Sequence, residues 1–262
     1  MRYYYLAASL MPLEFGDISE LNFLELVDKY SLSLTEASMK ALQVVRLYFD
    51  LENLRQTLAS GSEPLFFDTK GNLSQQELKE ALEQRVFFAE YVYDFLDSYK
   101  TPKEAYQHFP SLLSTYYQKE SEKAEGFLKE YLEFERGWRL IATGYRAKKE
   151  KKDVVKELEF EDPKDPLVAA VLSQKDSPHF EAPFGYEELQ EMLLTSKNKP
   201  MYQYRQLAEF RFRKVREMVA SKSFSLDYLL SYAIRVIILE DLHKLSAGKG
   251  SEILNSIVKD SA

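Results

Sequence analysis

The pattern of apolar and polar positions predicts helices along almost the whole chain. Apolar residues recur three and four positions apart over long stretches, which is typical of amphipathic α-helices. We expect helices at residues 17–30, 34–58, 75–99, 102–108, 111–149, 165–174, 185–195, 199–221, 226–246 and 251–259. Only the first segment, RYYYLAA, has a pattern that also suits a strand, and a buried helical turn is the alternative. The predicted fold class is therefore all-α, a body of packed helices.

Three of these helices are expected to begin at a capping box. In this motif a Ser or Thr side chain caps the first turn, and a Glu three residues later bonds back to the capping residue. The boxes are Ser33–Glu36, Ser74–Glu77 and Thr101–Glu104. Pro102 follows Thr101 at the first helical position, which proline favours.

The segment between residues 146 and 166 interrupts the helical pattern. Its sequence, RAKKEKKDVVKELEFEDPKDP, changes from basic to acidic and ends in two prolines. We interpret it as the exposed end of a long helix followed by a connection. The chain is then one all-helical domain over residues 1–262, with a lobe boundary near residues 150–165 as the open alternative.

The lysines of this segment allow two interpretations. Lys148, Lys149 and Lys151 lie near the expected helix C-terminus, where cations interact favourably with the helix dipole. Alternatively, they form a docking patch for a partner or for anionic lipid. The acidic residues that follow would weaken the field of such a patch.

Composition and charge exclude several classes of protein. The 262 residues are 45% hydrophobic, which is enough to bury a sizeable core. A net charge of −7 argues against nucleic acid as a partner, because such surfaces need clustered Lys and Arg. The absence of cysteine excludes disulfides, zinc–thiolate sites and a cysteine nucleophile. No stretch approaches the ~18 apolar residues of a membrane span, and a cytoplasmic location fits.

Motifs that suggest chemistry have simpler explanations. SAGKGSE at 246–252 follows a helix and lacks the first glycine of a phosphate loop. DTKGNLSQQEL at 68–78 lacks the early carboxylates of a calcium loop. His108, His179 and His243 have no spacing typical of paired metal ligands. We therefore predict no catalytic residues, no metal, no cofactor and no enzymatic activity.

A basic helix is expected near the end of the chain. The stretch YQYRQLAEFRFRKVRE at 202–217 interleaves Arg205, Arg211 and Arg213 with aromatic residues. An amphipathic helix with a basic face explains the pattern most simply, and RNA binding is the sharper alternative. If this face has a partner, an acidic protein surface is the expected one.

The stretch RLYFDLENLR at residues 46–55 contains the most informative motif. On a helix, with about 100° per residue, Arg46, Asp50 and Asn53 fall on one narrow stripe beside an apolar face. Facing water, such a stripe would contribute little to stability. Buried, it would need complete hydrogen bonding and would help to fix one packing arrangement. A similar stripe recurs in YLEFERGWRLIATGYR at 131–146, and Arg235 and Glu240 are embedded in a later apolar helix.

These residues carry a family resemblance. YFDLENLRQTL resembles the Asp-x-x-Asn-Leu/Ile-Arg/Lys signature of the C-type subunit (d-type in eukaryotes) of V/A-type rotary ATPases. YAIRVIILEDLHKLSAGKGSEILNSIV is similar to the C-terminal pattern of that protein, although Asp241-Leu242-His243 departs from its Asn-Leu-Arg-like triplet. YYYLAASLMPLEFGD together with DLENLR resembles, over the whole chain, a bacterial family of uncharacterised proteins encoded among V/A-type ATPase genes.

The resemblance implies a fold and a function. The C-type subunit is all-helical, has three pseudo-repeated lobes and no catalytic site, and joins the central stalk to the membrane ring of proteolipids. This chain is shorter than is usual for that family. By resemblance it would be a coupling subunit in proton or sodium transport, held peripheral to the inner membrane by the ATPase complex.

The resemblance also assigns roles to single residues. Asp50, Asn53 and Arg55 would shape an interhelical junction. Arg46 would belong to the same signature, and Glu240 would have a related buried role. A helical scaffold or assembly factor outside the finished motor is the alternative, and an enzyme with an interhelical carboxylate pocket is a third class.

Overall fold

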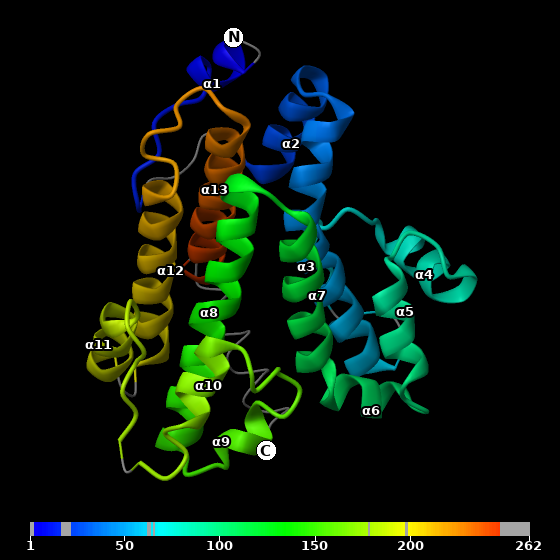
Figure 1. Ribbon diagram of the computed structural model, residues 1–262. Coiled ribbons are helices and arrows are strands. Elements are labelled where there is room, and N and C mark those ends of the chain that lie inside the picture. The colour runs from blue at the N-terminus through cyan, green and yellow to red at the C-terminus, as the bar shows by residue number, and fades with distance from the viewer. Residues whose placement is uncertain are drawn as a thin grey trace. The chain divides into compact units, whose positions relative to one another are not determined.

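The computed structural model describes residues 3–16, 22–61, 64, 66–177, 179–196 and 199–246. Within this part of the chain every regular element is a helix and no strand occurs, so the all-α prediction is confirmed (Figure 1). The predicted helix at 251–259 lies outside the described residues. The helices are α1 (Tyr4–Ala8), α2 (Phe23–Ser33), α3 (Glu36–Ser60), α4 (Gln75–Gln84), α5 (Glu90–Asp97), α6 (Pro102–Gln107), α7 (Phe109–Lys123), α8 (Gly126–Lys149), α9 (Val154–Glu157), α10 (Pro166–Leu172), α11 (Glu187–Thr195), α12 (Pro200–Glu217) and α13 (Leu226–Ser246).

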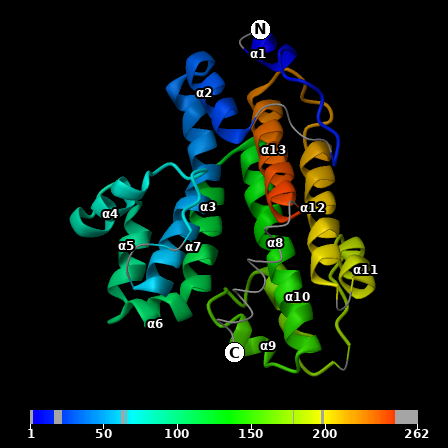
Figure 2. The same cartoon turned by 180° about the vertical axis from the view of Figure 1, so that it is seen from behind.

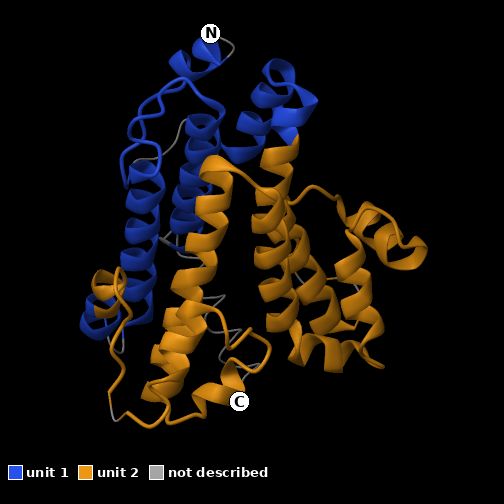
Figure 3. Cartoon of the chain, in the orientation of Figure 1, with its two compact units in different colours: residues 1–39, 191–262 blue, residues 40–190 orange. Residues whose placement is uncertain are grey.

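The chain divides into two compact units, coloured separately in Figure 3. Unit 1 comprises residues 1–39 and 191–262, and unit 2 comprises residues 40–190. The divisions fall inside α3 and inside α11. The connection at 150–165 lies within unit 2, where it is anchored by buried apolar side chains on and after α9.

Unit 1 is built around α13, which packs against α12 and α2 (Figures 1 and 2). The helix is apolar on most sides, as expected for one that is enclosed by neighbours. Buried hydroxyls attach it to both neighbours. Tyr30 Oη of α2 donates to the carbonyl of Leu229 (2.9 Å), and Ser231 Oγ donates to the carbonyl of Val215 in α12 (3.0 Å).

Unit 2 is built around the pair α7 and α8. α8 also packs against α9 and α10, whereas α5 and α6 pack against α7. Gly144 of α8 allows α10 to approach closely, because an added Cβ would lie 2.6 Å from Val171 Cγ1. The interior is filled mainly by aromatic and leucine side chains, among them Leu112, Tyr116 and Phe127.

Two long predicted helices are each divided in the structure. The helix expected at 75–99 ends at Arg85, which adopts a left-handed conformation (φ 57°), and α5 starts only at Glu90. The helix expected at 111–149 is broken between α7 and α8, where Ala124 is extended and Gly126 has φ 58°. Both predictions of one continuous helix were wrong. The three- and four-residue spacing of apolar positions continues across a turn when both helices face the same core. This spacing alone therefore cannot show where one helix ends and the next begins.

The predicted capping boxes have three different outcomes. Ser74–Glu77 forms both bonds of the box, as predicted. Thr101 caps the Glu104 backbone N–H, but the Glu104 carboxylate accepts from the backbone of Lys100 instead. Ser33 is the last residue of α2, so the prediction that it caps the next helix was wrong. A complete box that the sequence prediction overlooked, formed by Asn22 and Glu25, starts α2.

Candidate functional site

The acid–amide pair of α3 is buried and fully engaged. Asp50 is only 1% exposed and Asn53 only 2%. Asp50 Oδ1 accepts a hydrogen bond from the backbone N–H of Leu73 (3.0 Å), and Oδ2 accepts from Asn72 Nδ2 (2.8 Å). Both carboxylate oxygens therefore hold the loop that precedes α4.

The neighbouring residues of the stripe hold the same loop. Asn53 Nδ2 donates to the carbonyl of Asp68 (2.9 Å), and Asn53 Oδ1 accepts from the N–H of Asp68 (2.8 Å). Arg46 Nε donates to the carbonyl of Lys70 (2.9 Å), and its Nη2 donates to the carbonyl of Gly71. Arg46, Asp50 and Asn53, named the α3 clamp below, thus fix one backbone segment at successive points.

The loop sequence is matched to the α3 clamp. An added Cβ at Gly71 would lie 2.3 Å from Asp50 Oδ1, so only glycine fits there without displacing the carboxylate. The buried Lys70 ammonium forms an ion pair with Asp68 Oδ2 (2.7 Å) and lies 4.9 Å from the centre of the Phe49 ring. The segment that echoed a calcium loop is therefore a docked connection, and it ends at the Ser74 cap of α4.

Burial dominates the titration of Asp50. Removal from water raises the pKa of its carboxyl above the ordinary value. Hydrogen bonds from Leu73 and Asn72 and the charge of Arg46 act in the opposite direction, without cancelling the effect of burial. Because its oxygens accept bonds from the protein's own loop, this carboxylate is placed to hold structure.

The stripe on α8 that resembles the α3 clamp is buried at its first residue. Glu135, which is 1% exposed, accepts from Trp138 Nε1 (3.1 Å) and forms an ion pair with Arg139. The Arg139 guanidinium lies 5.2 Å from the ring centres of both Tyr48 and Tyr117. Burial lowers the pKa of Arg139, but Tyr117 and Glu135 outweigh it and raise the pKa well above the ordinary value. This arginine joins α8 to α3 and α7.

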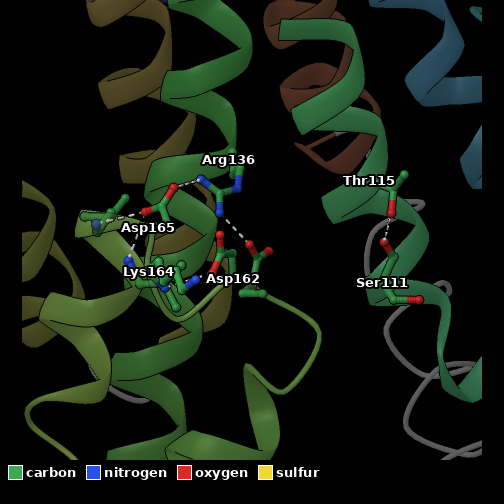
Figure 4. A network of polar contacts seen from close by, with 9 residues as sticks. Ser111, Thr115, Arg136, Asp162, Lys164 and Asp165 are labelled. Atoms are coloured by element: carbon green, nitrogen blue, oxygen red, sulfur yellow. Dashed lines mark hydrogen bonds and ion pairs between the residues drawn. The ribbon is translucent and has the colours of Figure 1, made fainter. Parts of the chain in front are cut away.

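A second arginine of α8 ties two further segments to that helix (Figure 4). Arg136 Nη1 contacts Asp165 Oδ2 (2.8 Å), and Nη2 contacts Glu161 Oε2 (2.5 Å). Asp165 also caps α10 by accepting from the backbone N–H of Leu167 (2.9 Å). Sequence reasoning missed this network. Arg136 lies in the stretch 131–146, where the sequence showed a second polar stripe. Its two carboxylate partners come from the segment that was interpreted as an exposed connection.

The other two signature residues lie elsewhere. Arg55 forms an ion pair with Glu52 of its own helix (2.8 Å), is partly exposed and takes no part in the α3 clamp. Glu240 belongs to unit 1, where its Oε1 accepts from the backbone N–H of Phe23 at the start of α2. The five signature residues therefore occupy three separate places.

The residues predicted to dock partners differ in how freely they face solvent. Lys148 donates to the carbonyls of Ser177 (2.9 Å) and Lys175, so it closes a loop of unit 2. Lys149 and Lys151, at the end of α8, are exposed. On α12, Arg205 is exposed and Arg211 is half-buried, while Arg213 contacts Glu217 of the same helix (3.3 Å).

Arg235 of α13 is buried in an apolar setting. It is 5% exposed, and its guanidinium lies 5.5 Å from the ring of Phe212 and 5.7 Å from that of Tyr232. Among the described residues no carboxylate forms an ion pair with it; its Nε donates to the carbonyl of Ser231 (3.3 Å). Burial lowers the pKa of this arginine.

Two further features are absent from the described part of the chain. No three or more His, Asp or Glu side chains in these residues are grouped so that they could hold a metal ion. No helix within the same residues is both long and apolar enough to cross a membrane.

Comparison with known proteins places this sequence in a family. The profile of a family described as "Protein of unknown function (DUF2764)" matches residues 1–261. The chain belongs to the DUF2764 family. A Chlamydia trachomatis relative, described as "Uncharacterized protein", is 31% identical to this DUF2764 chain over 258 residues, covering 98% of the chain and 97% of the relative. A Chlamydia pneumoniae relative is 28% identical over 265 residues, covering 99% and 98%. No solved structure matches.

Proposed function

We propose that this DUF2764 chain is a non-catalytic component of a bacterial V/A-type rotary ATPase, equivalent to its C-type subunit. It would be the adaptor that couples the central stalk to the membrane ring of proteolipids during proton or sodium transport. The observation that carries the proposal is the α3 clamp. Asp50 and Asn53, the acid and the amide of the motif that resembles the C-type signature, are buried and hydrogen-bonded to one loop, which is what a packing signature requires.

The mechanical properties of the helices support this role. A protein that transmits torque has to resist bending, and long helices joined by buried polar contacts are stiff. α3 has 25 residues, α8 has 24 and α13 has 21. Within unit 2 the α3 clamp, the Arg139 contacts and the Arg136 network hold α8 and the connecting segments in one arrangement. Such contacts would keep the unit rigid under load.

Two exposed basic positions are the proposed docking sites for other ATPase subunits. One comprises Lys149 and Lys151 at the end of α8, and the other centres on Arg205 of α12. Complementary charge speeds association and orients partners more than it adds affinity. We therefore infer acidic surfaces on the central stalk or ring opposite them. The protein would lie at the cytoplasmic face of the inner membrane because the ATPase complex holds it there.

Co-purification tests this proposal against the assembly-factor alternative. An ATPase isolated through a tagged proteolipid or stalk protein in mild detergent should contain this chain in fixed stoichiometry with the stalk. A chain found only with incomplete complexes would identify an assembly factor. A chain absent from both preparations would refute the association.

Charge-reversal variants sharpen the same experiment. Lys149→Glu with Lys151→Glu, or Arg205→Glu, should reduce recovery of the chain with the complex, and the difference from the parent chain should become smaller at higher salt, because salt screens exposed charges. Lys103→Glu reverses an exposed charge on α6 and serves as the matched control, which should leave recovery unchanged.

A further inference from the structure

Unit 2 contains a cavity whose lining has two kinds of surface. It lies between α7, α8 and the segment that follows α9, and its volume is about 240 Å³. One wall is apolar and includes Leu113, Leu140 and Phe160. α8, which also supplies Leu140, contributes three arginines, and Glu161 is the one carboxylate in the lining. The lining therefore combines an apolar wall with an excess of positive charge.

The three arginines are not equally engaged. Arg139 is committed to Glu135, and both Nη atoms of Arg136 are committed to Asp165 and Glu161. Arg146 is exposed and forms no ion pair with any described carboxylate. Glu150, one turn further along, forms its ion pair with Lys152 (2.9 Å), although it is near enough to feel the charge of Arg146. Arg146 thus offers a free guanidinium at the cavity, one turn from the hydroxyl of Thr143, which also lines it.

A second observation indicates that the cavity is built for a polar guest. Arg136 Nε is buried and has no hydrogen-bond partner within the described residues. Buried donors are nearly always satisfied by protein, water or ligand. An empty cavity of purely structural origin is normally apolar. The Arg146 guanidinium therefore favours a negatively charged occupant, and the orphan Nε of Arg136 shows that the same lining has a further donor without a protein acceptor.

We propose that this cavity binds a small organic carboxylate with an apolar body. The volume is below the range of about 300–1,000 Å³ that is typical for drug-sized ligands, so the ligand is smaller than those. Its carboxylate is held by Arg146 and Thr143, and its apolar body lies against Phe160 and Leu113. This inference concerns the chain alone and does not depend on its membership of an ATPase.

Calorimetric titration of the purified full-length protein with benzoate tests the proposal. Benzoate should bind saturably with a Kd on the order of 1 mM or tighter. Benzyl alcohol, which has the ring without the charge, and inorganic phosphate, which has the charge without the ring, should each bind at least about tenfold more weakly. Equal binding of either probe, or no saturable benzoate binding, would overturn the assignment.

Matched variants locate the binding. Arg146→Gln should weaken benzoate about tenfold or more by removing the guanidinium. Phe160→Ala should weaken it by truncating the partly exposed apolar wall. Lys129→Gln removes an exposed charge of the same helix that is outside the cavity lining, and it should leave the affinity unchanged. An Arg146→Gln protein that binds benzoate as well as the parent contradicts the proposed site.

Discussion

Asn53 forms two hydrogen bonds to one residue of the docked loop, so its removal has a definite expected cost. Asn53→Ala leaves both the N–H and the carbonyl of Asp68 without their partner. Buried polar groups left unsatisfied cost about 1–3 kcal/mol each. We expect the free energy of unfolding, measured in urea, to fall by about 2–4 kcal/mol.

Thr57 provides the control on the same stripe. Its hydroxyl bonds only to the carbonyl of Asn53 within its own helix (3.0 Å). Thr57→Ala should therefore lower stability by less than about 1 kcal/mol. Similar losses for the two variants would show that Asn53 does not hold the loop.

Asp50 gives the protein a pH dependence of predictable sign. Its pKa in the folded protein is raised above the ordinary value of 3.8, because burial disfavours the charged form. Between those two pKa values the folded state binds more protons than the unfolded state. The contribution of Asp50 to stability therefore decreases as pH rises through this window and returns as pH falls.

Asp50→Asn isolates this effect because it removes the titrating group. Urea unfolding at a series of pH values should show wild type gaining stability relative to Asp50→Asn as the pH is lowered through the window above 3.8. A relative loss of wild-type stability over that window would mean that hydrogen bonds, and not burial, control this carboxyl.

The sequence predicted the stripe of α3 but not its partner. Spacing places Arg46, Asp50 and Asn53 on one side of a helix whether that side faces water or protein. The loop that they hold is about twenty residues away, and its docking depends on non-local contacts. Gly71 carried a usable signal, since a glycine in a short polar loop is typical of close backbone approach.

At the scale of secondary-structure elements, Gly71→Ala tests whether loop docking and helix α3 act together. The added Cβ would displace the Asp50 carboxylate, so we expect a loss of about 2 kcal/mol in unfolding free energy. Hydrogen exchange at the backbone of Leu73 should also become faster, because its bond to Asp50 is lost.

A double-mutant cycle provides the control for Gly71→Ala. In an Asp50→Ala background the clash is absent, so the same glycine substitution should cost clearly less. An equal cost in the two backgrounds would indicate that backbone conformation, rather than contact with Asp50, determines the need for glycine.

Arg139 of α8, which is 24% exposed, and the buried Arg235 of α13 should respond oppositely to the same change. Arg139→Met strands the buried Glu135 carboxylate and should destabilise the protein by about 3–5 kcal/mol. Arg235 has no carboxylate partner among the described residues, so Arg235→Met should be neutral or stabilising by about 1 kcal/mol. Urea unfolding of both variants checks this, and a large loss for Arg235→Met would reveal a counterion for it.

The sequence predicted which parts of the chain are helical, but it predicted less well where a helix is interrupted. The local signals at Ser74–Glu77 are complete within a few residues, and the box forms as expected. The break at Arg85 has no glycine or proline to announce it, and a left-handed non-glycine residue (φ 57°) leaves no mark in the sequence. At 124–126 the glycine was visible, but the continuing apolar period outweighed it in the prediction.

At the scale of the whole molecule, the fold class followed from periodicity and the proposed function from resemblance. The division into two units could not be predicted, because it falls inside α3 and α11. The spacing of apolar residues continues through both helices and gives no sign of a boundary. The docking of 150–165 within unit 2 was hidden for a related reason. A charged stretch that ends in prolines suggests a linker. In the structure, Arg136 and a few buried apolar residues attach this stretch to the rest of unit 2.

The central claim is that this chain couples the soluble and membrane motors of a rotary ATPase. The most direct test compares purified ATPase prepared with and without the chain, in membrane vesicles, for ATP hydrolysis and ATP-driven ion transport. We expect the enzyme lacking the chain to hydrolyse ATP without transporting ions, and we expect the purified chain, when added back, to restore transport. Full transport without the chain would contradict the adaptor function.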